Sequence, residues 1–145
     1  MKIKERTEQR VVTETYNIYI ADDGKEFDTK KQCEMYEKEQ LFLKKEKSVN
    51  MLKLSYDLLP LTLYDDWREC DVDWYRIENE TQYNTLKEYY ELKGSGTEYF
   101  SAPESYPATI CVTDYEEYAE TYYLDTLIEV TKKYFSTFGL NVTIN

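Results

Sequence analysis

The residues of this chain that are able to do chemistry are carboxylates, because the sequence holds 29 Asp and Glu but no His. Histidine is the commonest general base near neutral pH, so the Ser-His and Cys-His catalytic pairs are excluded. The chain has no GxGxxG and no GxxxxGK[ST] motif, and dinucleotide and P-loop sites therefore lack their phosphate cradle. The acidic segment DDG at 22–24 does not fit a calcium loop, because Tyr19 and Ala21 occupy positions that should hold ligands.

Two arrangements of carboxylates remain as catalytic alternatives. Glu91 and Lys93 match the E-x-K tripeptide of one nuclease class, with Asp71 or Asp73 as the partner acid, but the tripeptide lies in a helical pattern and not in a strand. A glycosidase-type pair of carboxylates is also compatible with so acidic a chain, although nothing selects two acids among the 29. We therefore expect a protein that is not an enzyme and that binds no cofactor or metal.

An acidic, tyrosine-rich surface is the stronger pattern. The chain has a formal charge of −11, and residues 54–145 alone have a balance of −12, with 18 Asp and Glu against 6 Lys and Arg. The whole chain has 16 Tyr. Such a field disfavours nucleic acid and favours basic partners, while tyrosine supplies contact area at interfaces. We predict that a partner is bound by Asp65, Asp66, Asp71, Asp73, Tyr75, Asp114, Tyr115, Glu116, Glu117, Tyr118, Glu120 and Tyr122. The alternative is a solvated face that only keeps the protein soluble.

The first fifty residues predict a ββα unit. Residues 10–20 are rich in β-branched and aromatic residues, Asp23-Gly24 is typical of a hairpin turn, and residues 25–27 form a short second strand. A helix capped by Asp28 or Thr29 follows and ends near residues 48–50. Its inward face is predicted to carry Cys33, Tyr36, Gln40 and Leu43.

Residues 18–40 resemble a C2H2 zinc finger that lacks its zinc ligands. The residues that match the finger pattern are Gly24, Lys25 and Phe27, and Cys33 stands at the position of its leucine. The four ligand positions hold Ile20 and Asp23 in place of cysteines and Tyr36 and Gln40 in place of histidines. Because zinc needs four sulfur or nitrogen donors, we expect the shape without the metal. The expected hydrophobic plug consists of Ile20, Phe27, Cys33 and Tyr36.

The remaining sequence predicts a second module of mixed structure. Alternation over residues 69–78 indicates a strand with Cys70, Val72 and Trp74 on an apolar face and Asp71, Asp73 and Tyr75 on an acidic face. Further predicted elements are a helix at 79–94, a loop at 94–107, a buried strand at 108–114, an acidic loop or hairpin arm at 114–123, a helix at 124–138 and a final strand at 140–145. The three cysteines are too widely spaced for a disulfide framework and are expected to be buried.

The fold class that follows is α+β: a ββα finger-like module at 1–50, then an acidic, tyrosine-rich domain at 51–145 with a two-layer α/β sandwich and an antiparallel or mixed sheet. The apolar run 51–64, which contains Pro60, either crosses the core or joins the two modules. The N-terminus lacks the apolar run of a secretory signal, so we expect a cytoplasmic protein.

The opening segment, with its strand, DGK-x-F and C-x-x-Y-E, also resembles small accessory proteins of phages and mobile elements of low-GC Gram-positive bacteria. These accessory proteins include inhibitors of host defence such as anti-CRISPR proteins. The resemblance implies a phage-borne inhibitor in the bacterial host cytoplasm, acting as an acidic DNA mimic on a basic nucleic-acid-handling enzyme. Two alternatives stay open. One is an assembly module that forms a homo-oligomer through Tyr16, Ile18, Phe42 and residues 51–64, and the other is a small-nucleotide sponge.

Overall fold

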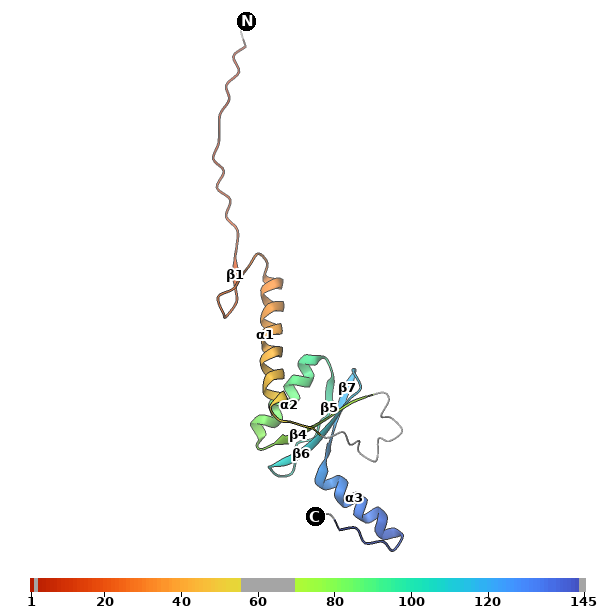
Figure 1. The fold of residues 1–145 in the computed structure, drawn as a ribbon. Coiled ribbons are helices and arrows are strands. Elements are labelled where there is room, and N and C mark those ends of the chain that lie inside the picture. Colours follow the sequence, from red (N-terminus) through yellow and green to blue (C-terminus); the bar gives the residue numbers. More distant parts are fainter. Residues whose placement is uncertain (2, 56–69, 144–145) are drawn as a thin grey trace. The chain divides into compact units, whose positions relative to one another are not determined.

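The computed structural model describes residues 1, 3–55 and 70–143, and they form an α+β fold of three helices and two sheets. The chain divides into two compact units, Met1–Glu39 and Gln40–Asn145, which we term the N-terminal and C-terminal units. This division falls inside helix α1 (Lys30–Asn50), whereas the predicted module boundary follows the last residue of that helix. Figure 1 labels the helices and strands.

The N-terminal unit is a small ββα structure. Strands β1 (Tyr19–Ile20) and β2 (Glu26–Phe27) pair antiparallel, and Gly24 turns the chain between them with a φ of 89°. The side chain of Thr29 accepts a hydrogen bond from the Gln32 amide at 3.3 Å, so it caps α1 as predicted. The strand predicted over residues 10–20 is wrong for most of its length. Only its last two residues pair, because the partner strand β2 is itself only two residues long.

The small core of this unit differs from the predicted plug. Cys33 is buried and Phe27 packs on Tyr36 with ring centroids 5.1 Å apart, as expected. Ile20, however, is 62% exposed, and the neighbouring Ala21 is buried in its place. Adjacent side chains of an extended chain point to opposite faces, so Tyr19 and Ala21, on either side of Ile20, face inward and Ile20 faces outward.

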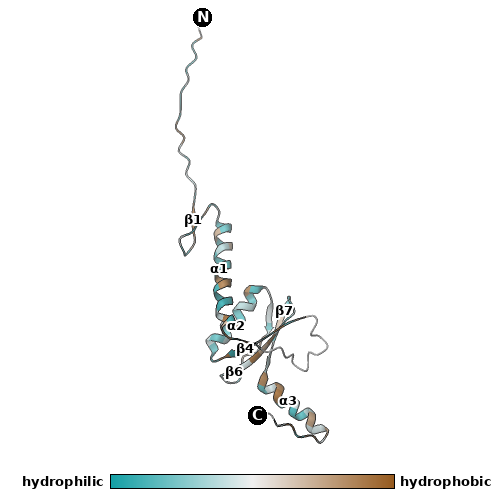
Figure 2. Ribbon diagram, in the orientation of Figure 1, coloured by the Kyte–Doolittle hydropathy of each residue, from teal (hydrophilic) through white to brown (hydrophobic). Residues whose placement is uncertain are grey.

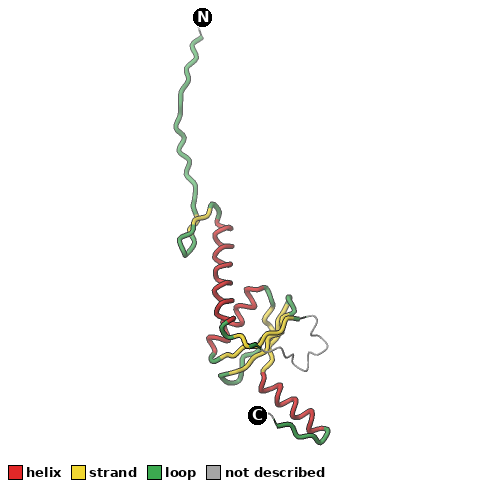
Figure 3. Tube along the Cα trace, in the orientation of Figure 1, coloured by secondary structure: helices red, strands yellow, loops and turns green. Residues whose placement is uncertain are grey.

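The C-terminal unit is built on a five-stranded mixed sheet with the strand order β3-β4-β6-β7-β5. Figure 3 shows strands in yellow and helices in red. Its strands are β3 (Lys53–Leu54), β4 (Asp71–Ile77), β5 (Gly96–Tyr99), β6 (Ala108–Asp114) and β7 (Tyr118–Tyr123). All pairs are antiparallel except β5 with β7. Strands β3 and β5 were not expected from the sequence. The polar, glycine-containing segment of β5 reads as a loop, and its strand conformation depends on pairing with β7.

Helix α2 (Glu80–Lys93) covers one face of this sheet. It is capped by the side chain of Asn79 and ends at Gly94, whose φ is 106°, as predicted. Its residues Tyr83, Leu86 and Tyr90 are buried against residues of β4 and β6. This core consists of Val49, Tyr75, Ile77, Tyr83, Leu86, Tyr90, Ala108, Ile110, Val112 and Ala119.

The burial of the two faces of strand β4 differs from the prediction of one apolar and one acidic face. Tyr75 and Ile77, which share the predicted acidic face with Asp71 and Asp73, are buried beneath α2. Trp74 is buried on the opposite face, where Cys111 is its cross-strand partner. Both faces of the strand are therefore covered in its second half, and the acidic residues lie only at its beginning.

Helix α3 (Leu124–Thr137) follows directly on β7 and contacts β6 and β7. It ends before Gly139, which has a φ of 72°, as predicted. The final strand predicted over residues 140–145 is absent from residues 140–143, which the structure describes without regular structure. Of the three free cysteines, Cys33 and Cys111 are buried and Cys70 is half-buried.

Candidate functional site

One end of the five-stranded sheet gathers acidic residues from β4, β6 and the turn that joins β6 to β7. The register of β4 and β6 sets Asp71 directly opposite Asp114. The turn is closed by hydrogen bonds of 2.9 Å from the Tyr115 amide to the Tyr118 carbonyl and from the Glu117 amide to the Tyr115 carbonyl. Asp71, Glu116 and Glu117 are exposed there. We term Asp71, Asp114, Glu116 and Glu117 the acidic sheet end.

The buried side chain of Asp114 holds the β6–β7 turn in place through hydrogen bonds. It is only 4% exposed, and its carboxylate accepts hydrogen bonds from Lys93 Nζ at 2.5 Å, Ser95 Oγ at 2.7 Å and the Glu116 amide at 3.0 Å. Burial acts to raise the pKa of Asp114, but the hydrogen bonds from Lys93 and Ser95 outweigh burial and hold the pKa below its ordinary value. The predicted contact residue Asp114 is therefore a buried anchor, which leaves the exposed acids of the turn as the surface.

Three tyrosines border the acidic sheet end. The rings of Tyr115 and Tyr118 stack with centroids 4.8 Å apart, and Tyr99 meets Tyr118 edge to face at 5.4 Å. Tyr115 and Tyr118 are half-buried, while Tyr99 is 57% exposed. This tyrosine cluster provides a rigid aromatic surface beside the carboxylates, a combination that is common at protein interfaces. Tyr99 was not predicted, because its strand reads as a loop in the sequence.

Asp73 is paired with a neighbouring strand, and Tyr75 belongs to the interior. Asp73 is half-buried and forms an ion pair of 2.6 Å with Lys53 of β3. Tyr75 is 2% exposed, and its hydroxyl lies 3.0 Å from the hydroxyl of Tyr90. Burial raises the pKa of Tyr75. The prediction that Tyr75 contacts a partner is therefore not supported by its position, because a partner has no access to a side chain under α2.

Glu120 and Tyr122 lie on the face of the sheet opposite α2, which Tyr118 shares by alternation along β7. Their cross-strand partners are Thr113 and Cys111, which alternate with the residues that face α2. The Tyr122 hydroxyl donates a hydrogen bond of 2.6 Å to Glu120, and burial followed by this bond raises the pKa of Tyr122. The predicted contact residues are thus divided between two faces. Asp65 and Asp66, as well as most of the apolar run 51–64, lie outside the described residues.

Other acids of the C-terminal unit lie away from this site. Glu78 and Glu80 follow the opposite end of β4, and Glu88 on α2 forms an ion pair with Lys45. Among the described residues, the predicted acidic surface is therefore formed by only some of the acids, namely those of the acidic sheet end.

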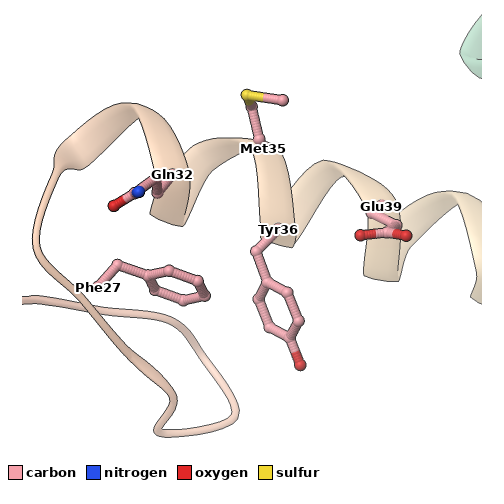
Figure 4. Close-up of a pocket in the computed structure, with 5 residues that line it drawn as sticks. All are labelled: Phe27, Gln32, Met35, Tyr36 and Glu39. Carbon is pink, nitrogen blue, oxygen red and sulfur yellow. The ribbon is translucent and has the colours of Figure 1, made fainter.

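The N-terminal unit contains a shallow groove between its hairpin and helix α1 (Figure 4). The groove has a volume of about 490 Å³ and is lined by Phe27, Gln32, Met35, Tyr36 and Glu39. Beside the groove, the Tyr36 hydroxyl of helix α1 donates a hydrogen bond of 2.7 Å to Asp23 of the hairpin. The ammonium group of Lys25 lies 4.3 Å from the centre of the Tyr36 ring. A hydrogen bond and a cation–π contact therefore join the hairpin to the helix.

The described residues hold no group of three or more His, Cys, Asp or Glu side chains that could bind a metal ion. Glu91 and Lys93, the E-x-K pair, lie on α2 and are engaged with Thr97 and Asp114 respectively. None of the helices in the described ranges has the length and apolar character that a bilayer-spanning segment requires. Comparison with family models, with curated proteins and with solved structures finds no match to this chain.

Proposed function

We propose that this chain is a non-enzymatic binding protein whose acidic sheet end and tyrosine cluster bind a basic surface of another protein. The observation that supports the proposal is the position of Asp71, Glu116 and Glu117. They are exposed together at one sheet end, beside three packed tyrosine rings. Carboxylates select a basic partner and steer its approach, while the tyrosines contribute buried area after contact.

The turn is suited to binding because its shape is set before a partner arrives. Asp114 ties the turn to Lys93 and Ser95, which lie at the end of α2 and just beyond it. The parallel pairing of β5 with β7 begins beside the turn, where the Gly96 amide donates a hydrogen bond of 2.8 Å to the Glu117 carbonyl. A surface that is already ordered loses less conformational entropy on binding, so more of the contact energy appears as affinity.

The finer proposal is that the basic surface is the nucleic-acid groove of a bacterial defence or nucleic-acid-handling enzyme, which the chain blocks as an acidic mimic of the phosphate backbone. Residues 54–145 carry 18 Asp and Glu against 6 Lys and Arg, and this field attracts the surfaces that bind nucleic acid. Under this proposal the chain and duplex DNA compete for one site.

The test is capture from a lysate of a low-GC Gram-positive bacterium on the immobilised chain, followed by elution with duplex DNA. We expect duplex DNA to release the captured protein, and a rise in salt to release it steeply, because both act on charge pairing. Capture is expected to fail with the double variant Glu116→Gln/Glu117→Gln.

The matched control is Glu80→Gln/Glu104→Gln, which removes the same charge from exposed positions outside the acidic sheet end. It should capture as the parent chain does. Capture that survives DNA and salt, or that both double variants lose equally, contradicts the proposal.

A further inference from the structure

The segment that leads into β1 has the composition of a strand without a partner strand in its own unit. Residues 10–18 read RVVTETYNI and consist mostly of β-branched and aromatic residues, which favour an extended backbone. In the described ranges only Tyr19 and Ile20, which follow directly, pair with another strand. Every residue from 3 to 18 is exposed. Figure 2 shows this segment, coloured by hydropathy, running from the N-terminus to β1.

One face of this extended segment is apolar. Alternation places Val12, Tyr16 and Ile18 on the same face as Ile20, which is turned away from helix α1. Val12 is 75% exposed, Tyr16 76% and Ile18 46%. Strand β2 is only two residues long and is already paired with β1, so a partner for residues 10–18 comes from outside the N-terminal unit.

The charged residues on this face indicate which strand is the partner. Arg10 and Glu14 stand at equal distances before and after Val12 and share its face by alternation. Within the described part of the chain, neither takes part in an ion pair. When two copies run antiparallel about Val12, Arg10 of each copy stands directly opposite Glu14 of the other. The segment is therefore complementary in charge to an inverted copy of itself, on the same face that carries the apolar side chains.

We infer that residues 6–18 of two copies of the chain pair as antiparallel strands about a two-fold axis at Val12. The two-fold symmetry repeats the contact between Arg10 and Glu14, and backbone hydrogen bonds form along both strands. An in-register parallel pair aligns like charges, and an antiparallel pair shifted by two residues loses both ion pairs. Charge therefore selects the orientation and the register, since opposite charges directly across a strand pair stabilise it and like charges destabilise it.

The position of the segment suits contact between two copies of so acidic a chain. Residues 1–18 hold 4 Lys and Arg against 3 Glu, whereas residues 54–145 hold 18 acids against 6 basic residues. Two copies therefore repel each other less at this segment than at the C-terminal unit. The pairing ends at Ile18, so Tyr19 and Ile20 keep their pairing with β2. The inference does not depend on the acidic sheet end.

The first experiment is disulfide cross-linking of the full chain under mild oxidation, read by non-reducing electrophoresis. Val12→Cys should give a covalent dimer, because the two copies of residue 12 face each other at the axis within reach of a disulfide. Glu8→Cys and Tyr16→Cys should each give none alone, since the two copies of each residue stand at opposite ends of the pair. A mixture of these two variants should cross-link, because residue 8 of one copy stands opposite residue 16 of the other. The parent chain, with Cys33 and Cys111 buried and Cys70 half-buried, gives the background.

The second experiment is sedimentation of the full chain over a wide range of concentration. A two-stranded ribbon is only marginally stable in water, so we expect a reversible dimer of micromolar or weaker affinity. Arg10→Glu should weaken the dimer by about tenfold, because both symmetric contacts change from attraction to repulsion. Glu14→Arg should do the same, and an equimolar mixture of the two variants should restore the dimer. Lys4→Glu makes the same charge change outside the paired residues and should leave the dimer nearly unchanged.

These variants lie outside both hydrophobic cores, and far-ultraviolet circular dichroism confirms that each one folds. A chain that is monomeric up to about 1 mM overturns the inference, even if residues 10–18 pair with a strand of another protein. A dimer that tolerates Arg10→Glu as well as it tolerates Lys4→Glu also overturns it. The same holds if Glu8→Cys cross-links alone as efficiently as Val12→Cys, because the strands then have another register.

Discussion

The N-terminal and C-terminal units differ in the kind of contact that stabilises each of them internally. Among the described residues of the N-terminal unit, only Ala21 and Cys33 are buried hydrophobic residues, and the hairpin is joined to the helix by exposed polar contacts. The C-terminal unit has a core of ten buried residues from α1, α2 and three strands. Small units bury too little surface to be stable by their cores alone. The comparison teaches that the small ββα unit is held mainly by polar and ring contacts, whereas the larger hydrophobic core lies in the C-terminal unit.

The largest expected effect comes from the core of the C-terminal unit. Leu86 is fully buried, and Leu86→Ala should lower the free energy of unfolding by about 3 kcal/mol through lost burial and a residual cavity. Urea unfolding followed by circular dichroism measures it. Asn84→Ala, at an exposed position of the same helix, should change the free energy by less than about 0.5 kcal/mol. If Cys33→Ala in the N-terminal unit destabilises the chain as much as Leu86→Ala, the comparison between the units is wrong.

The next effect concerns the buried anchor of the acidic sheet end. Asp114→Asn removes a charged acceptor from Lys93 and Ser95 and should cost about 2 kcal/mol near neutral pH. Because the pKa of Asp114 lies below its ordinary value, its stabilisation is present above that ordinary value and is lost as pH falls through the folded-state pKa. The difference between the parent chain and Asp114→Asn should therefore shrink on acidification.

Urea unfolding at neutral and acidic pH measures this difference. Glu116→Gln, two residues away and exposed, is the control and should leave stability nearly unchanged at both pH values. A difference that grows on acidification would show that the carboxylate of Asp114 is not held in its charged form.

A smaller effect is expected in the hairpin of the N-terminal unit. Gly24 has a φ of 89°, and a Cβ added there meets no atom within 4 Å, so Gly24→Ala is opposed only by backbone conformation. The cost should be about 1 kcal/mol. Gly24→Asn should cost less, because Asn tolerates left-handed conformations.

Hydrogen exchange measures the effect at the Ala21 amide, which donates to the Lys25 carbonyl across the turn. Exchange within the core of the C-terminal unit should not change. If core amides exchange faster in Gly24→Ala, the two units do not unfold separately.

The smallest effect is a change in titration. The hydrogen bond from Tyr36, followed by the one from the Lys25 amide, lowers the pKa of Asp23. Since a hydrogen bond to a carboxylate favours its charged form, Tyr36→Phe should raise the pKa of Asp23 toward its ordinary value. Titration of the Asp23 carboxyl carbon by nuclear magnetic resonance measures the shift. Tyr16→Phe, at a residue that is 76% exposed, should leave the pKa of Asp23 unchanged.

Much of the fold could be predicted from the sequence where a few neighbouring residues decide the structure. The helix limits at Asn79, Gly94 and Gly139 follow from capping chemistry, and the hairpin follows from Asp23-Gly24. The strand predicted at residues 10–20 failed because alternation indicates a strand only when a partner strand is present. Strands β3 and β5 were missed for the converse reason: they are too short to show alternation, and pairing alone makes them strands.

The candidate site was predicted only in part. Glu116 and Glu117 are exposed in a turn, as an acidic hairpin connection suggests, whereas Asp114 and Tyr75 are buried. Alternation in β4 separates two faces but does not say which one α2 covers. The burial of Asp114 depends on Lys93 and Ser95, which are about twenty residues away in sequence and are brought close by the end of α2.

The sequence by itself determined the local elements and the unequal distribution of charge, because caps, glycine turns and side-chain charge act within a few residues of their own position. The tertiary structure decided which carboxylates are exposed and which tyrosines are buried. It also decided that Tyr36 of the helix and Asp23 of the hairpin meet in a hydrogen bond. These properties depend on contacts between residues distant in sequence, since packing and desolvation are set by neighbours in space.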